Sequence, residues 1–187
     1  MIAIDNSPVR LACAKHNAKI YGVADRITFI LGDFVSWSKD YVARKTAGSV
    51  DPSDEVEVVF LSPPWGGIDY REVASNDSPA SRLKYNNGAV PSTMTPTLPA
   101  TQPAYPLAAL APLPGDQLFS LARAITPHVA FYLPRNVDIE EVAMLTKVFS
   151  RSDKDAAEVE RVEVEEEWMA GKMKAVTVYY GDLATQV

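Results

Sequence analysis

Cysteine and histidine are scarce in this chain. Its 187 residues include one cysteine, Cys13, and two histidines, His16 and His128. A single cysteine cannot form an internal disulfide, which fits a reducing compartment. Cys13 falls in an apolar helical stripe, so we interpret it as a buried core thiol. Neither histidine has a ligand partner at metal spacing, and the sequence therefore predicts no metal site.

Long apolar runs and clustered positive charge are missing too. No run is long enough to cross a bilayer, so we expect no membrane partner. The net charge of −6 argues against a generic nucleic-acid-binding protein, because phosphate affinity comes from clustered Lys and Arg. A short nucleic-acid end needs only a few well-placed cations and is not excluded. With 47% hydrophobic residues, the chain can bury one core, and we expect one domain over residues 1–187.

Strand and helix patterns alternate along the chain. Repeated units of this kind predict an α/β protein with a mostly parallel sheet that is covered on both faces. Residues 73–115 differ, because they hold eight of the fourteen prolines, mixed with Ser, Thr, Asn and Ala. That composition is typical of a flexible insertion. The expected strands are 2–4, 27–31, 56–61, 128–133, 159–169 and 173–180, and the expected helices are 9–21, 34–44, 116–125 and 139–149.

The most informative segment is Ser-Pro-Pro-Trp-Gly-Gly at residues 62–67, directly after the apolar run 56–61. That run predicts a buried parallel strand ending at the rim where open α/β sheets bind ligands. The two prolines fix φ and lack N–H donors, so we expect a stiff turn whose carbonyls stay free to accept. The glycines let the backbone pass close to a flat ring. The segment predicts acceptors beside an exposed indole, suited to an exocyclic amino group on a stacked base.

This strand and turn resemble the (Asp/Asn/Ser)-Pro-Pro-(Tyr/Phe/Trp) motif of S-adenosylmethionine-dependent methyltransferases that act on exocyclic amines. A longer likeness, to the trimethylguanosine synthase family of RNA cap guanine-N2 methyltransferases, rests on four ordered segments. The resemblance implies a Rossmann-like class I α/β fold and S-adenosylmethionine as cofactor. It also implies methyl transfer to N2 of the 7-methylguanosine cap of small nuclear and nucleolar RNA, in the nucleus or nucleolus. The four segments are FLSPPWGG at 60–67, DY at 69–70, YLPRN at 132–136 and YGDL at 180–183.

The fold implied by the resemblance has a central first strand that ends in a glycine-rich loop for the methionine part of the cofactor. This chain begins with what corresponds to the second strand, and no glycine-rich turn precedes Asp5. We therefore expect a partial methyltransferase domain that lacks the first strand and its loop. Without that strand, the sheet should divide into two parts with unpaired inner edges.

Two aspartates and a phenylalanine are candidates for binding the cofactor. Asp5 ends the first expected strand, where a carboxylate can accept hydrogen bonds from ribose hydroxyls. The segment around it would also begin a helix well, which is the alternative. By resemblance, Asp33 accepts from the adenine amino group while Phe34 borders the ring. A solvated loop carboxylate is the alternative for Asp33.

The candidate catalytic groups are Ser62 and Pro63, and the resemblance also places Ser62 beside the cofactor. The N2 amine of guanine is a weak nucleophile because its lone pair is delocalised into the ring. Ser62 Oγ or the Pro63 carbonyl can accept its N–H groups and aim the lone pair, so most of the catalysis would be positioning. Trp65 would stack on the cationic 7-methylguanine through cation–π attraction. A core position is the alternative for Trp65.

Three further residues are candidates for binding the cap phosphates. Arg135 follows an expected strand in a tight turn and can offer a bidentate fork. By resemblance, Tyr70 and Lys174 match other phosphate-binding positions. Surface ion pairing is the alternative for both cations.

Two other classes of protein fit the same sequence. A different exocyclic-amine methyltransferase, acting on guanine N2 or adenine N6 of other RNA or DNA, would share the Pro-Pro turn. It would have no reason to carry the Trp-Gly-Gly and Pro-Arg-Asn segments. A non-catalytic cap-binding or interaction module is favoured by the missing cofactor loop. Ile68 stands where the family usually has proline, which makes the acceptor turn less rigid.

Overall fold

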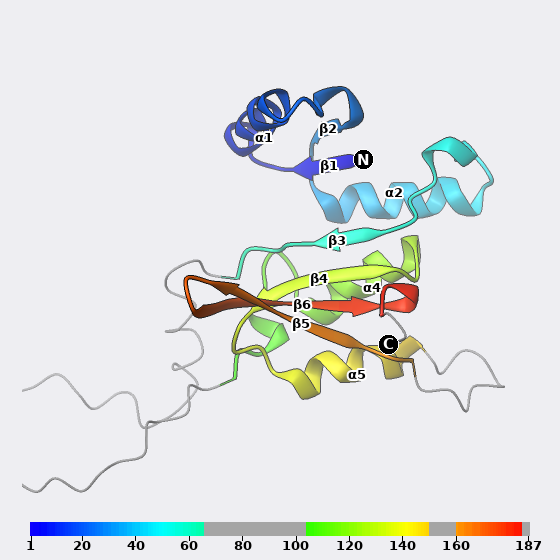
Figure 1. Cartoon of the computed structure of the whole chain (residues 1–187). Helices are drawn as coiled ribbons and strands as arrows, with labels where there is room; N and C mark the ends of the chain where they lie inside the picture. The colour runs from blue at the N-terminus through cyan, green and yellow to red at the C-terminus, as the bar shows by residue number, and fades with distance from the viewer. Residues whose placement is uncertain (66–103, 150–159, 185–187) are drawn as a thin grey trace, which may run out of the picture.

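The computed structural model describes residues 1–65, 104–149 and 160–184 of the chain (Figure 1). Helices and strands alternate through most of this length, which confirms the predicted α/β class, but the prediction of a mostly parallel sheet is wrong, because the strand Lys172–Tyr180 pairs antiparallel with both of its neighbours. The elements are β1 (Ile2–Asp5), α1 (Pro8–Ile20), β2 (Thr28–Leu31), α2 (Phe34–Thr46), β3 (Val59–Leu61), α4 (Gly115–Ile125), β4 (Val129–Pro134), α5 (Ile139–Phe149), β5 (Glu163–Met169) and β6 (Lys172–Tyr180).

The strands form two separate sheets. Strands β1 and β2 pair in parallel, and the second sheet has the order β3-β4-β6-β5. In the second sheet β3 and β4 are parallel, whereas β6 runs antiparallel to both of its neighbours. Within the described residues, β1 and β3 each pair with one neighbouring strand. Figure 1 shows the two-stranded sheet at the top and the four-stranded sheet below it. The expected division of the sheet is therefore confirmed.

Helix α1 has clear signals at both ends but little buried surface. Ser7 caps its first turn by accepting from the N–H of Arg10, and Gly22 follows its end with a positive φ of 68°. Leu11 and Ala18 are its buried residues. Cys13 is exposed, so the prediction of a core thiol is wrong. The reason is that the helix contacts the sheet along a narrow line, which leaves most of its apolar stripe uncovered.

The core lies between the four-stranded sheet and helices α4 and α5. Phe119 of α4 lies 4.4 Å from Tyr180 and 6.4 Å from Phe131, measured between ring centroids. The Tyr180 hydroxyl donates to the Val142 carbonyl of α5 at 3.2 Å. Each fully buried side chain of this size contributes about 1.5–3 kcal/mol through the hydrophobic effect. This packing fixes the positions at which the strands end. The buried strand residues are Val59, Leu61, Val129, Ala130, Phe131, Leu133, Pro134, Ala175, Val176, Thr177, Val178 and Tyr180.

The prediction of a flexible insertion over 73–115 is wrong in its last part. Residues 73–103 lie outside the described residues, but 104–115 pack against the core. Tyr105, Leu107 and Leu110 are buried there. The Tyr105 N–H donates to the Asn136 carbonyl at 2.7 Å, and the Tyr105 carbonyl accepts from Asp138 at 3.0 Å. Composition did not reveal this, because prolines are compatible with an extended segment that needs few N–H donors.

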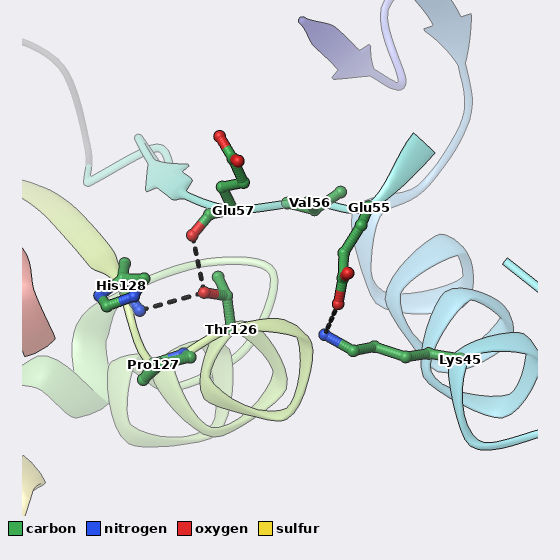
Figure 2. A pocket seen from close by; sticks show the side chains of 7 residues that line it. All are labelled: Lys45, Glu55, Val56, Glu57, Thr126, Pro127 and His128. Carbon is green, nitrogen blue, oxygen red and sulfur yellow. Dashed lines mark hydrogen bonds and ion pairs between the residues drawn. The ribbon is translucent and has the colours of Figure 1, made fainter. Parts of the chain in front are cut away.

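The strand predicted for residues 56–61 is shorter than expected. The N–H of Val56 donates to the Tyr41 hydroxyl at 2.8 Å, and the Glu57 carbonyl accepts from Thr126 Oγ1 at 2.7 Å (Figure 2). Side chains of α2 and of the α4–β4 connection therefore satisfy these backbone groups in place of a neighbouring strand. Regular pairing begins at Val59.

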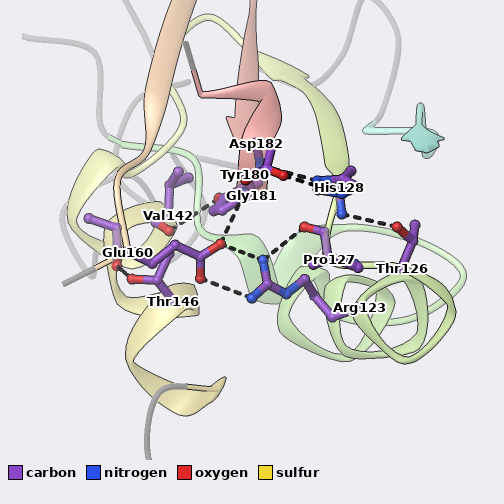
Figure 3. Close-up of polar contacts among 11 residues, drawn as sticks. Arg123, Thr126, Pro127, His128, Val142, Thr146, Glu160, Tyr180, Gly181 and Asp182 are labelled. Atoms are coloured by element: carbon purple, nitrogen blue, oxygen red, sulfur yellow. Dashed lines mark hydrogen bonds and ion pairs between the residues drawn. The ribbon is translucent and has the colours of Figure 1, made fainter. Parts of the chain in front are cut away.

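A partly buried ion pair connects α4 to the segments that flank the β5–β6 hairpin. Arg123 of α4 forms a bidentate ion pair with Glu160, in which Nη2 lies 2.9 Å from Oε2 (Figure 3). The Arg123 and Glu160 side chains are 11% and 19% exposed. Glu160 also accepts from the N–H of Gly181 at 3.0 Å, and Arg123 donates to the Pro127 carbonyl. Beside this pair, the N–H of Asp182 donates to His128 Nδ1 at 3.1 Å.

Replacing Glu160 with Ala is expected to lower the free energy of unfolding by about 1–3 kcal/mol, because the change leaves a partly buried guanidinium without its carboxylate. The matched control is Glu55→Ala. Glu55 pairs with Lys45 at 2.8 Å, but its side chain is 52% exposed. Loss of that exposed pair should cost less than about 1 kcal/mol. Urea unfolding of both variants measures the difference, and equal losses would contradict the structural role of the Arg123–Glu160 pair.

Candidate functional site

The candidate acceptor residues gather at the carboxyl end of the parallel strands β3 and β4. Leu61 of β3 pairs with Phe131 of β4, so Ser62 begins the chain's exit from the sheet at this edge. On the next strand, Pro134 of β4 pairs with Ala175 of β6. The next residues outward, Arg135 and Lys174, therefore lie near each other at the same edge. Tyr70 lies outside the described residues.

The Pro-Pro turn has one anchored carbonyl and an accessible serine. Ser62 and Pro64 are exposed and Pro63 is partly buried. The Pro64 carbonyl accepts from the N–H of Ala111 at 3.4 Å, so the expectation that the turn's carbonyls stay free is wrong for this one. The contact fastens the turn to the packed 104–115 segment.

Trp65 is half-buried. Its indole packs against the hydrophobic core, and its ring centroid lies 6.2 Å from that of Tyr132 at an angle of 44°. The expectation of an exposed indole and the alternative of a core residue each describe part of this side chain. Such a position supports one part of the ring and leaves another part accessible.

The two cations at this edge differ in exposure. Arg135, in the turn after β4, is partly buried, and Lys174 of β6 is exposed. Arg135 follows β4, and Lys174 lies in β6 one residue beyond the Pro134–Ala175 pair. Together they can place positive charge at the sheet edge where Ser62 follows β3, in a chain whose net charge is −6. An anionic group at this edge would be attracted by these two nearby cations, although the chain as a whole is negatively charged.

The candidate cofactor residues lie at the carboxyl end of the other sheet. Asp5 ends β1, and its carbonyl accepts from the N–H of Gly32 at 3.1 Å, which holds Asp5 close to the residues that follow β2. Asp5 Oδ1 accepts from the N–H of Ser7 at 2.6 Å and lies 3.3 Å from Arg10 Nε. The contacts expected of a helix-starting acid are therefore present. Its side chain remains 33% exposed.

Asp33 is the N-cap of α2. Its Oδ2 accepts from the N–H of Ser36 at 2.9 Å and from the Ser36 hydroxyl at 3.0 Å. The hydrogen bond from the Ser36 backbone is the main cause that lowers the pKa of Asp33 below its ordinary value. Asp33 is exposed, whereas Phe34 is partly buried and packs against the core.

The capping role of Asp33 can be tested directly. Asp33→Ala is expected to lower the free energy of unfolding by about 1 kcal/mol. Asp33→Asn should retain most of the stabilisation that the cap provides, because Asn caps equally well. The carboxylate has a lowered pKa in the folded protein, so its contribution to the free energy of unfolding is fully present above the ordinary aspartate pKa. The contribution is lost as the pH falls through the lowered value. Thermal unfolding measured between about pH 6 and about pH 3 should therefore show a smaller decrease in stability on acidification in Asp33→Asn than in the unmodified chain.

The site fits one part of S-adenosylmethionine. Two carboxylates at the ends of neighbouring parallel strands are suitable acceptors for a ribose and an adenine amino group. The glycines in residues 1–33 are Gly22 and Gly32, and neither forms a glycine-rich turn beside Asp5. The described residues therefore fit the adenosine part of the cofactor, and they do not provide a glycine-rich cradle for its methionine part.

A cavity of about 350 Å³ lies at the opposite edge of the sheet (Figure 2). It opens near the amino ends of β3 and β4, away from Ser62. Its polar groups already bind one another, since Lys45 pairs with Glu55 and Thr126 bonds to the Glu57 carbonyl. This cavity is therefore not the candidate site. Its lining residues are Lys45, Glu55, Val56, Glu57, Thr126, Pro127 and His128.

The described ranges hold neither a metal-binding cluster nor a membrane-spanning helix. No three or more His, Cys, Asp or Glu side chains come together there in a way that could hold a metal ion. No helix in those ranges is both long and apolar enough to cross a membrane.

The contacts of Tyr132 were missed in the sequence. The resemblance of residues 132–136 to the family assigns no role to the tyrosine. The alternation of strand residues could have indicated its position, because Tyr132 faces away from the buried Phe131 and Leu133 and lies on the same face as Phe60. Phe60 and Tyr132 have ring centroids 6.4 Å apart.

The strand order, the parallel strand ends and the Pro-Pro turn define the class of the protein, an α/β methyltransferase of the Rossmann-like class I type. A family model described as RNA cap guanine-N2 methyltransferase matches residues 1–89 and 100–183. The chain belongs to this family.

Two curated relatives agree with this assignment. Trimethylguanosine synthase of Schizosaccharomyces pombe is 32% identical over 152 residues, which cover 81% of this chain and 48% of that protein. Trimethylguanosine synthase of Saccharomyces cerevisiae is 27% identical over 144 residues, which cover 77% of this chain and 34% of that protein. The chain thus spans half or less of the length of each of these two relatives.

Proposed function

We propose that this chain is the catalytic part of an S-adenosylmethionine-dependent methyltransferase that acts on N2 of the 7-methylguanosine cap of small nuclear and nucleolar RNA. The observation that carries the proposal is the Ser-Pro-Pro-Trp turn at the end of β3, at the same sheet edge as Arg135 and Lys174. The family and the names of the two relatives support it. Such a substrate would place the protein in the nucleus, the nucleolus included.

In this mechanism the turn positions the amine. Ser62 Oγ and the Pro63 carbonyl accept the N–H groups of the guanine N2 amine and direct its lone pair. When bound, S-adenosylmethionine supplies a methyl group on a positively charged sulfur. Asp5 and Asp33 would hold its adenosine part. The methylated ammonium is acidic enough to lose its proton readily, so no side chain needs to act as a base.

The remaining residues recognise the cap. Trp65 presents the accessible part of its indole to the 7-methylguanine ring, whose positive charge strengthens the stack. Arg135 and Lys174 bind the cap phosphates, Arg135 through its planar fork and Lys174 as a point charge. Tyr70 would add a hydroxyl donor to the same phosphates.

The test is methyl transfer by the natural protein that contains this chain. Two RNAs of the same sequence, one with a 7-methylguanosine cap and one with an unmethylated guanosine cap, would be incubated with labelled S-adenosylmethionine and digested for mass spectrometry. We expect N2-methylated cap nucleosides from the first RNA and far fewer from the second. Methyl groups found on adenine N6 or on internal guanine would support a different exocyclic-amine methyltransferase, and cap binding without any transfer would support a non-catalytic module.

A further inference from the structure

Tyr132 lies at the centre of a short aromatic row on one face of the four-stranded sheet. Its neighbours in β4, Phe131 and Leu133, are completely buried toward α4 and α5, so Tyr132 points to the other face. There its ring contacts Phe60 at 6.4 Å and Trp65 at 6.2 Å, at angles of 41° and 44°. Both separations fall in the range in which tilted aromatic rings attract each other.

The Pro-Pro turn that precedes Trp65 has few backbone donors of its own. The two preceding residues are prolines without N–H donors, and Trp65 itself is outside any helix or strand. The Pro64 carbonyl accepts from the N–H of Ala111 at 3.4 Å, which is long for a hydrogen bond. Tyr132 is one of the side chains whose contact with the indole can set its orientation.

We propose that Tyr132 is a positioning residue for cap recognition, one that holds the Trp65 indole in the orientation in which it stacks on 7-methylguanine. The inference rests on the proposed function. Phe60 is 62% exposed and contacts Tyr132 from the neighbouring strand β3, whereas Tyr132 belongs to β4, an inner strand of the sheet. The ring acts by contact alone, so its hydroxyl is not needed for the role.

The test compares Tyr132→Leu, Tyr132→Phe and the matched control Tyr179→Leu in the 187-residue chain. Tyr179 lies on the same sheet face, is also half-buried, and bonds to Glu165 at 2.6 Å. The probe is a 7-methylguanosine dinucleotide cap analogue, titrated by calorimetry. We expect Tyr132→Leu to weaken binding about 3- to 10-fold, and we expect Tyr132→Phe and Tyr179→Leu to bind within about twofold of the unmodified chain.

A second readout reports on the indole itself. The near-ultraviolet circular dichroism of coupled Trp65 and Tyr132 rings should change in Tyr132→Leu and be retained in Tyr132→Phe. Equal cap affinity in the unmodified chain and in Tyr132→Leu would overturn the inference and leave the proposed function intact, as would an equal loss in Tyr179→Leu. Absence of cap binding by the unmodified chain would overturn both.

Discussion

Replacing Trp65 with Ala is expected to weaken binding of a 7-methylguanosine cap analogue by about 10- to 100-fold, since one base–aromatic stack contributes about 1–3 kcal/mol. The reason lies in the charge of the ligand. Methylation at N7 makes the guanine ring cationic, and the indole has the most negative face of the aromatic side chains. The same physical argument predicts that the unmodified chain binds 7-methylguanosine more tightly than guanosine ends.

A graded series makes this result specific. Trp65→Phe keeps a weaker π face and should retain part of the affinity, so the expected order is Trp, then Phe, then Ala. The control is Trp168→Ala, because Trp168 is 61% exposed on β5 and bonds to Glu166. Fluorescence quenching by the analogue measures affinity, and thermal unfolding shows whether loss of the half-buried indole has disturbed the core. An unchanged dissociation constant in Trp65→Ala would return this residue to a purely structural role.

Replacing Ser62 with Ala is expected to lower turnover by about 10- to 100-fold in the natural protein that contains this chain, with cap affinity changed by less than about threefold. Ser62 is exposed at the strand end, so its removal leaves no buried group unsatisfied. Its hydrogen bond aims a delocalised lone pair and matters most in the transition state. The effect should therefore appear in kcat rather than in ground-state binding.

The matched control for this change is Ser53→Ala. Ser53 is also exposed, and its hydroxyl donates to Asp51 at 2.6 Å in the turn Pro52–Asp54, which precedes β3, whereas Ser62 follows that strand. That variant should keep both turnover and affinity. Equal losses in cap binding and turnover in Ser62→Ala would mean that Ser62 holds the ring rather than aiming the amine.

Most of the fold could be predicted because local signals and burial agree in this chain. The helix predicted at 139–149 matches α5, and the strands at 173–180 and 128–133 match β6 and β4 within one residue. Errors occurred where tertiary contacts replaced local rules. The Tyr41 hydroxyl and Thr126 shorten β3 from one side. Tyr105 and its neighbours are buried by contacts with the residues that follow β4, which no local composition can indicate.

The candidate site could be predicted at the level of strand ends and less well at the level of side-chain surroundings. Parallel strands bring their carboxyl ends to one edge, which is why Ser62 and Arg135 could be paired from the sequence. The environment of Trp65 could not, because it depends on Tyr132 from another strand and on the 104–115 segment. The roles of Asp5 and Asp33 in binding a cofactor stay predictions, since their observed contacts are those of helix starts.

The separation of the two sheets has a consequence for local unfolding. In the unit formed by β1, α1 and β2, the buried side chains are Leu11 and Ala18, whereas the four-stranded sheet contains most of the core. Amide hydrogens of the first unit should exchange with solvent through openings that cost much less free energy than global unfolding. Asp5 belongs to this less stable unit. A nucleoside bound there would have to order the unit as it binds, so part of its intrinsic affinity would be observed as slower amide exchange rather than as a tighter dissociation constant.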